Sequence, residues 1–317
     1  MSRHLFQPKV FHNAIGLGDP VQTVDDGDTI VTQTVDAWGF DARDEQVAIR
    51  PNPMTGPFFV IGAEPGDTLE VRIDRMTPNR ATGWTFAPVA SSVVDPAITS
   101  SLPERKRSIW MLDGNGKVAR LAEASTALRD WTVPMRPMIG CFGVAPALNQ
   151  AISTATSGPY GGNMDYPLFA PGTSAQFPVS VSGALFYLGD GHASQGDGEI
   201  VGNGIETSFE VEFTVRVLKG RRIAWPRGET LDEIFAVGNA RPLDQALQHA
   251  TTELMNWLTT DFGLDLVEAS HVLGQCARFD IANVYNPAYS VACRLSRKAI
   301  PSIRQEPAAL EACLRNF

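Results

Sequence analysis

The chain has little positive charge, few cysteines and no long apolar run. Its 317 residues carry 26 Lys and Arg against 35 Asp and Glu, a formal charge of −9. Nucleic-acid and anionic membrane surfaces need concentrated positive charge, so this balance argues against both as partners. No uncharged run approaches the roughly 20 apolar residues that cross a bilayer, and the first residues lack an apolar core of signal-peptide length. We therefore expect a cytoplasmic protein, and the composition is compatible with a neutral small-molecule substrate.

Several common motifs are also missing. The four cysteines, Cys141, Cys276, Cys293 and Cys313, lie far apart without a CxxC pair, which excludes a zinc knuckle and a dithiol redox motif. A chain of this length buries a large core without disulfides, so we expect free buried thiols. There is no GxGxxG after a strand, no P-loop and no GxSxG elbow, so nucleotide-binding and α/β-hydrolase folds are not expected.

Short β-strands are predicted over the first three quarters of the chain. Residues 29–35 are rich in β-branched side chains. Residues 57–61 and 69–73 flank the sequence GAEPGD, in which proline presets φ and glycine accepts a positive φ. Residues 208–217 alternate apolar and polar side chains, as is typical of a half-buried antiparallel strand. These patterns predict a mainly β protein with a sandwich or barrel-like body.

The last quarter has a different pattern. Residues 242–258 place leucine and alanine at helical spacing, and a second helix is predicted over about residues 266–276, followed by a strand over residues 289–295. We expect a β-rich body over residues 1–237 that carries the active site, and a smaller C-terminal α/β portion over residues 238–317 packed on it.

Two short stretches place acidic and amide groups beside glycine. In PYGGNMDY, residues 159–166, adjacent glycines permit a tight turn or a close backbone approach, and Asn163 and Asp165 follow them. In VDAWGFD, residues 35–41, Asp36 stands at the end of a predicted strand. Both stretches are candidate parts of a polar site.

A third stretch, LGDGHASQGDGE over residues 188–199, is the most unusual. An extended backbone would place Asp190 and His192 on one face, and Asp197 and Glu199 would be related in the same way. One interpretation is a hydrolytic site in which a divalent metal polarises a carbonyl and activates water, while a carboxylate moves the proton. The same composition is also ordinary in a Gly/Asp loop or a calcium-stabilised turn. Spacing alone leaves these interpretations open.

A nucleophilic side chain is less well supported. Cys141, in MIGCFGVAP, has apolar and glycine neighbours and no base nearby in the sequence, so a small buried residue is the simpler interpretation. The five lysines lie outside the polar stretches, and His192 alone among the histidines has acidic neighbours.

Four blocks of the sequence resemble the acetamidase/formamidase family. They are NPMTGPFFVIGAEPGDTLEVRI at 52–73, IGCFGVAP at 139–146, GPYGGNMD at 158–165 and GALFYLGDGHASQGDGEIVGNGIE at 183–206. They occur in the family's order, and the resemblance covers most of the chain. It implies a β-rich fold, hydrolysis of the C–N bond of a small amide such as formamide or acetamide with release of ammonia, and a homo-oligomer (a dimer or higher). Some shorter members of the family bind metal, so the resemblance also implies a possible metal site.

Site residues follow from the resemblance position by position. Our hypothesis is that Asp36, Asp190 and His192 hold a divalent metal, either zinc or zinc with calcium. Glu199 or Asp197 would then act as the acid/base group, and the backbone of residues 161–163 would donate to the developing oxyanion. The polar positions that match the family pattern, which include the further catalytic candidates Asn163 and Asp165, are Asp36, Asn163, Asp165, Asp190, His192, Gln195, Asp197 and Glu199.

One departure from the family pattern keeps two alternatives open. Tyr160 stands where the family commonly has a histidine before GGNMD, which removes one possible metal ligand. The chain could then be an inactive member that serves as a small-molecule binding or structural protein. A metal-free amidase with Cys141 as its nucleophile is the other alternative.

Overall fold

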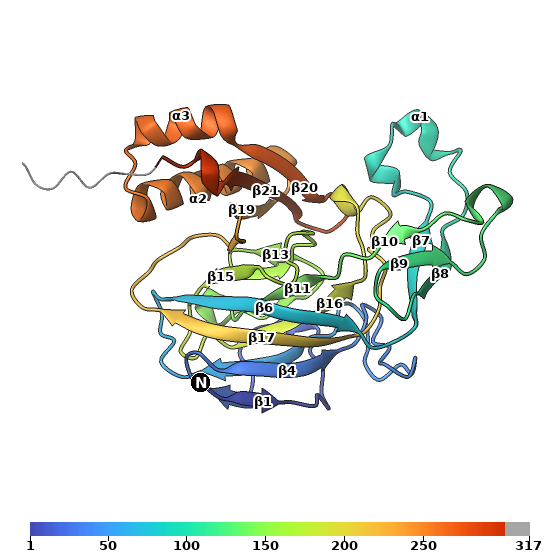
Figure 1. Cartoon of the computed structure of the whole chain (residues 1–317), viewed down its shortest axis with the longest axis horizontal. Coiled ribbons are helices and arrows are strands. Elements are labelled where there is room, and N and C mark those ends of the chain that lie inside the picture. The colour runs from blue at the N-terminus through green and yellow to red at the C-terminus, as the bar shows by residue number, and fades with distance from the viewer. Residues whose placement is uncertain (302–317) are drawn as a thin grey trace, which may run out of the picture.

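The computed structural model describes residues 1–301, and its largest element is a nine-stranded β-sheet (Figure 1). In pairing order its strands are β1 (Arg3–Leu5), β4 (Thr29–Thr34), β17 (Phe209–Leu218), β6 (Thr68–Pro78), β15 (Ser174–Pro178), β18 (Arg227–Glu229), β19 (Glu233–Ala240), β21 (Tyr289–Ser296) and β20 (Arg278–Asn283). All of its neighbouring strands are antiparallel except β1 and β4, which are parallel.

A six-stranded sheet packs against the larger one. Its strands, in order, are β13 (Ser157–Gly158), β14 (Gly161–Asn163), β11 (Met138–Val144), β16 (Phe186–His192), β5 (Thr55–Val60) and β3 (Gln22–Val24). The ring of Phe213 in β17 lies 5.5 Å from that of Phe58 in β5 and 5.3 Å from that of Phe186 in β16. These contacts join the two sheets in one apolar core, so the prediction of a mainly β protein is confirmed.

The alternation of apolar and polar residues over 208–217 produces a strand with one buried face, as predicted. Phe209, Val211, Phe213 and Val215 of β17 are fully buried in the core between the sheets. The intervening side chains lie on the other face, where Glu212 pairs with Arg3 and Arg75. A side-chain period of two therefore decides which face of the strand is buried.

The predicted C-terminal helices are also present, as α2 (Leu243–Asp261) and α3 (Leu266–Cys276). Asp265 caps α3 by accepting from the backbone N–H groups of Val267 and Glu268. A separate apolar cluster joins both helices to β19 and β21. Strand β19 spans the boundary expected between residues 237 and 238, and pairs with β18 on one side and with β21 on the other.

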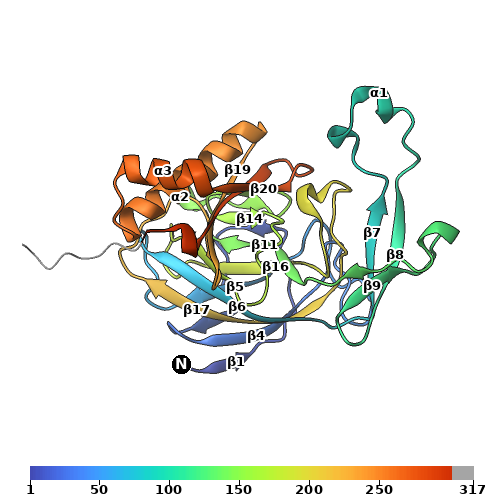
Figure 2. The same ribbon diagram turned by 45° about the horizontal axis from the view of Figure 1, so that its top comes forward.

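A third sheet lies at the end of the molecule opposite α2 and α3 (Figures 1 and 2). Its order is β10 (Val133–Pro134), β9 (Val118–Leu121), β8 (Lys106–Leu112) and β7 (Thr82–Ala87), and the short helix α1 (Pro96–Thr99) lies in the connection between β7 and β8. This connection projects from the sandwich in Figure 2. A two-stranded pairing of β2 (Ala14–Ile15) with β12 (Ile152–Ser153) completes the described strands.

Among residues 1–301, no helix combines the length and the hydropathy that crossing a membrane requires. Cys141, Cys276 and Cys293 are free thiols; Cys141 and Cys293 are buried, as predicted, whereas Cys276 is exposed. Cys313 lies outside the described residues.

Candidate active site

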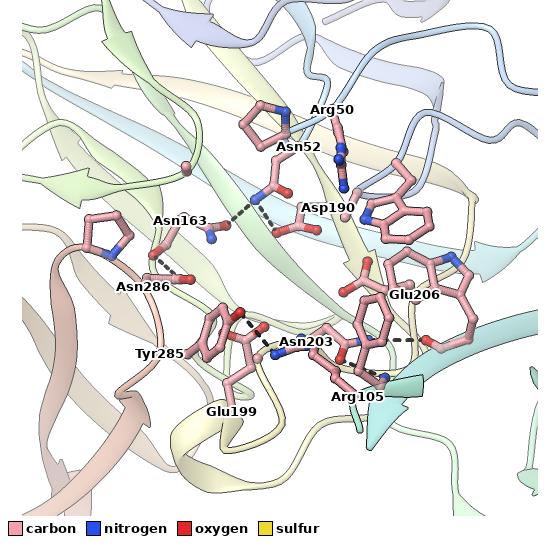
Figure 3. A pocket seen from close by; sticks show the side chains of 18 residues that line it. Arg50, Asn52, Arg105, Asn163, Asp190, Glu199, Asn203, Glu206, Tyr285 and Asn286 are labelled. Carbon is pink, nitrogen blue, oxygen red and sulfur yellow. Dashed lines mark hydrogen bonds between the residues drawn. The ribbon is translucent and has the colours of Figure 1, made fainter. Parts of the chain in front are cut away.

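A cavity of about 410 Å³ lies where strand ends and loops from distant parts of the chain meet (Figure 3). Strand β16 contributes Asp190, β14 contributes Asn163, and the turn after β16 contributes Glu199. Glu206 follows that turn, and its backbone forms antiparallel bridges with His192 and with Trp84. The buried polar lining of the cavity is therefore carboxylate and carboxamide, with the side chains Asn52, Asn163, Asp190, Glu199, Asn203, Glu206 and Asn286.

Four buried carboxylates surround one buried imidazole at this end of the cavity. The ligand atoms of Asp190, His192 and Glu206 all lie within 4.8 Å of one another, and those of Asp165, His192 and Glu199 do the same. His192 Nε2 is 2.9 Å from Glu206 Oε1 and 3.6 Å from Asp190 Oδ1. The imidazole is common to both groups, so one cation or two could be held around it.

The tautomer of His192 follows from its neighbour Gln195. The Gln195 amide nitrogen lies 2.7 Å from the carbonyl oxygen of Asp165 and 3.2 Å from that of Ala282. Only an N–H₂ group can donate to both, so Gln195 Oε1 faces His192 Nδ1 at 2.8 Å and must accept from it. A neutral His192 then directs its Nε2 lone pair at the carboxylates of Asp190 and Glu206. That arrangement is repulsive unless a proton or a metal cation lies between them.

Thirteen buried side-chain atoms have no hydrogen-bond partner among residues 1–301, and five of them belong to His192 and the four carboxylates around it. These five are Asp165 Oδ1, Asp190 Oδ1, His192 Nε2, Glu199 Oε2 and Glu206 Oε2. An unpaired buried polar group is costly, and more so if it is charged. Oxygen and imidazole nitrogen are ligands that zinc accepts, and carboxylate oxygens also suit calcium. The donor set therefore fits a divalent cation.

Negative charge is crowded among the buried carboxylates around His192, and this crowding shifts their pKa values. Burial, together with the charges of Asp190 and Glu206, raises the pKa of Glu199 to about 8 although His192 opposes the shift. Burial and Asp190 likewise raise the pKa of Glu206 to about 8 against the effect of His192. Burial lowers the pKa of His192, but the carboxylates of Glu206 and Asp190 outweigh it and raise that pKa well above its usual value. These groups hold protons near neutral pH unless a cation replaces them.

The backbone is strained where these side chains project. Asn52, Asp165, Asp190 and Glu199 have φ angles of 37°, 46°, 53° and 48°, in the left-handed region that non-glycine residues seldom occupy. Such conformations cost of order 1–3 kcal/mol each and gather at functional sites. The surrounding packing must therefore hold these four residues in place.

Gly140 lies against Asp165 and Asp190, two of these four residues. Its carbonyl accepts from the backbone N–H of Asp165 at 3.0 Å, and a Cβ at residue 140 would lie 2.5 Å from Asp165 Oδ1 and 2.8 Å from the Asp190 carbonyl oxygen. We expect Gly140→Ala to displace Asp165 and to cost about 1–3 kcal/mol of unfolding free energy, the usual cost of overpacking. Thermal or urea unfolding would measure it.

Gly114→Ala is the matched control, because a Cβ at residue 114 would meet no atom of residues 1–301 within 4 Å. Equal stabilities of the two variants would show that the space at Gly140 is not constrained by Asp165 and Asp190.

Three asparagines organise the polar wall of the cavity (Figure 3). Asn52 Nδ2 donates to Asn163 Oδ1 at 2.9 Å and to Asp190 Oδ2 at 3.0 Å. The Asn163 Nδ2 group has no acceptor among residues 1–301 and is available to a ligand. Asn286 Nδ2 donates to Asp165 Oδ2 at 2.6 Å. The backbone N–H of Asn163, expected as an oxyanion donor, instead donates to the Thr156 carbonyl at 3.0 Å.

Two of the predicted site residues, Asp36 and Asp197, lie apart from the carboxylates around His192. Asp36 Oδ1 accepts from the backbone N–H groups of Trp38 and Phe40, and its Oδ2 accepts from Arg80 Nη2 at 2.8 Å and Trp84 Nε1 at 2.9 Å. Its carboxylate is thus saturated, and it belongs to neither of the two groups around His192. Asp197 is exposed and does not line the cavity.

The alternative of an inactive family member rests on Tyr160, and that of a cysteine nucleophile on Cys141. Both side chains are buried outside the cavity. Tyr160 packs in an apolar cluster with Cys141, and its hydroxyl donates to the Thr156 carbonyl at 3.3 Å. Cys141 Sγ lies 3.5 Å from the Thr154 carbonyl oxygen. Burial, with smaller contributions from Asp190 and Asp165, raises the pKa of the Cys141 thiol well above its usual value. Neither side chain lines the cavity.

Sequence reasoning missed three residues of the site. Glu206 closes the block GEIVGNGIE and Asn52 opens the block NPMTGPFF, so both stood at the ends of stretches already singled out. Asn286, in the connection between β20 and β21, carries no local signal. Gln195 was recognised only as a matching position, and the structure adds its bond to His192.

The sequence and the fold are similar to those of known proteins. A sequence profile of the acetamidase/formamidase family matches residues 8–155 and 147–249. The acetamidase of Mycolicibacterium smegmatis is 27% identical over 253 residues, a match that covers 64% of this chain and 62% of that protein. The matched region thus spans less than two thirds of the length of this curated relative.

Solved structures are similar over nearly the whole chain. The acetamidase from Yersinia enterocolitica is 30% identical with a TM-score of 0.82, covering 94% of this chain and 93% of that one. The acetamidase from Bacillus halodurans is 29% identical with a TM-score of 0.80, covering 92% and 97%. A γ-lactamase from Delftia acidovorans, at 20% identity and a TM-score of 0.58, shares the fold alone.

Proposed function

Because this chain belongs to the acetamidase/formamidase family, we propose that it is an amidase that hydrolyses the C–N bond of a small carboxamide and releases ammonia. The observation that carries the proposal is that five buried polar atoms, unpaired within residues 1–301, converge around His192, and that three of the carboxylates among them, Asp190, Glu199 and Glu206, line the cavity. Several similar proteins are named acetamidases, so formamide and acetamide are the first substrates to test.

Asp190, His192 and Glu206 are the proposed ligands of a divalent cation, with Glu206 in place of Asp36. Zinc is the first candidate because the set includes an imidazole nitrogen, and calcium is the second because the other donors are carboxylates. The bound cation would polarise the amide carbonyl and lower the pKa of water. Gln195 orients the imidazole by accepting from Nδ1, as outer partners of metal-binding histidines do.

Glu199 is the proposed acid/base group. As a carboxylate it accepts a proton from the attacking water, and as a carboxylic acid it returns that proton to the leaving nitrogen. A pKa of about 8 suits both roles near neutral pH. Asn163 Nδ2, which has no acceptor in the described part of the chain, would donate to the developing oxyanion. Asp165, held by Asn286, would position Glu199.

The test is ammonia release from a panel of small amides, before and after treatment with a chelator, combined with elemental analysis of the purified protein. We expect turnover, about one equivalent or more of divalent metal, and loss of both on chelation. Protein free of metal and inactive on every amide would support a binding protein instead.

Cys141 supplies a prediction that separates the metal-assisted reaction from a thiol nucleophile. We expect Cys141→Ser to change kcat by less than about tenfold, because the thiol is buried with a raised pKa and faces a carbonyl oxygen. Steady-state kinetics on the best amide would measure it. Complete loss of turnover in a variant with wild-type stability would favour the cysteine mechanism.

Cation affinity should depend steeply on pH. In the cation-free protein Glu199 and Glu206 have pKa values of about 8, above the usual 4.5, so a cation must displace protons below that pH. Affinity should rise roughly tenfold per pH unit for each proton released and level off only once the two glutamates and the ligand His192 have lost their protons. Zinc titration against a competing chelator between pH 6 and 9 would measure it.

The same shifts predict the stability of the cation-free protein. Because the pKa values are higher in the folded than in the unfolded state, the folded state binds more protons between pH 4.5 and 8. Its stability should therefore fall as pH rises through that interval. A rise in stability over the same interval would contradict the assignment.

Homo-oligomerisation and a cytoplasmic location also remain predictions. Light scattering on the purified protein would measure the first.

A further inference from the structure

The aromatic and basic side of the cavity differs in character from its acidic floor, which consists of Asp190, Glu199 and Glu206. Trp38, Trp84 and Phe86 form one aromatic wall, with ring centroids 4.7 Å apart for Trp38 and Trp84 and 5.5 Å apart for the two pairs that include Phe86. Tyr285 lies near Arg105 on the other side of the rim (Figure 3). Faces of this kind stack on planar groups.

Two arginines stand at the rim. The Arg50 guanidinium lies 5.5 Å from the Trp38 ring centroid, and that of Arg105 lies 4.4 Å from Phe86 and 5.1 Å from Tyr285. Arg105 donates one hydrogen bond, to the Tyr285 hydroxyl at 3.0 Å. Neither arginine is within 4.0 Å of a carboxylate in residues 1–301, although both are exposed on an acidic protein. Their remaining N–H donors are available to an anion.

The aromatic wall is held rigidly, and Asp36 is its support. Its carboxylate accepts from Trp84 Nε1 and from the backbone N–H of Trp38, and the buried Arg80 balances its charge. Asn203 adds a second tie, accepting from the backbone N–H of Phe86 and donating to the Trp84 carbonyl. The buried Asp36 therefore positions a binding surface.

The size of the cavity also indicates a ligand larger than acetamide. A volume of about 410 Å³ falls in the range of roughly 300–1,000 Å³ that holds drug-sized ligands. Acetamide would fill a small part of it and reach none of the rim. The rim offers two guanidinium groups to an anion, whereas the floor holds the proposed amide-cleaving groups, so a substrate that carries a carboxylate would bind with its amide toward the floor and its carboxylate at the rim.

We propose that the preferred substrate is a carboxamide whose acyl portion carries a planar ring and, at the end away from the amide, a carboxylate. The ring packs against Trp38, Trp84 and Phe86, and the carboxylate binds Arg50 and Arg105. This specificity rests on the proposed amidase function.

The test compares three amides: acetamide, benzamide and terephthalamate, the monoamide of terephthalic acid. We expect kcat/KM to rise in that order. Arg50→Gln and Arg105→Gln should each lower the ratio of kcat/KM for terephthalamate to that for benzamide by about tenfold, the effect of one charge-assisted contact. Arg129→Gln, an exposed arginine outside the cavity, should leave the ratio unchanged.

Calorimetric binding of terephthalamate to the same variants separates this inference from the amidase function. Arginine-dependent binding without turnover of any amide would overturn the function and support the specificity. Acetamide turned over as efficiently as both aromatic amides would overturn the specificity and leave the function intact. A terephthalamate-to-benzamide ratio that neither arginine changes would overturn the assignment of the anion site.

Discussion

Replacing His192 with alanine is expected to remove the bound cation and to lower turnover by more than about 100-fold. His192 belongs to both groups of candidate ligands, and its Nε2 is the nitrogen donor that they share. Losing even an outer partner of a metal ligand costs about 10–100-fold in affinity or activity, so losing the ligand itself should cost more. Elemental analysis and ammonia release on one preparation would measure both.

The control for this variant is His271→Ala, because His271 is exposed on α3. It should keep wild-type metal content and turnover. If His192→Ala retained both as well, the ligand set around the imidazole would be wrong, and the cavity floor would need another account of its unpaired atoms.

Replacing Glu199 with glutamine is expected to lower kcat by about 10²–10⁴-fold, the usual contribution of a positioned acid/base group. The amide is similar in shape to the carboxylic acid but cannot accept the proton from water. Because Asp190, His192 and Glu206 remain, the variant should still bind the cation. The measurement is kcat together with metal content.

Asp197→Asn makes this experiment decisive between the two acid/base candidates. Asp197 is only two residues away but exposed and outside the cavity, so its replacement should change kcat by less than about twofold if Glu199 is the group that moves the proton. A large loss in Asp197→Asn with a small one in Glu199→Gln would reverse the assignment. Loss of metal from Glu199→Gln would make Glu199 a ligand.

The elements that local patterns predict are present in the fold. Helix α3 spans the predicted residues 266–276, and β21 begins at the predicted Tyr289. Strand β17 buries the face that its alternation indicates. The pairing order of the nine-stranded sheet was not predictable in the same way, because β17 lies between β4 and β6 although some 130 residues or more separate them in sequence.

In the site, too, some contacts follow from local strand geometry and others only from the tertiary structure. Asp190 and His192 lie two residues apart on β16, and their proximity follows from strand geometry. Asp36 also follows a strand, but there the chain turns so that the Asp36 N–H bonds to the Phe40 carbonyl. The carboxylate consequently faces its own backbone, Arg80 and Trp84, and the position beside the imidazole is taken by Glu206.

The sequence by itself determined the β-rich class, the C-terminal helices, the family and the paired acidic and imidazole side chains of residues 188–199. Each of these depends on periodicity or on a contiguous motif, which are properties of neighbouring residues. Only the tertiary structure decided that Glu206 and Asp165 join His192, that Asp36 supports an aromatic wall, and that the cavity rim holds two arginines with no acidic partner among residues 1–301. Those contacts join residues far apart in the chain, and their geometry is set by sheet pairing and turn conformation, which no local pattern encodes.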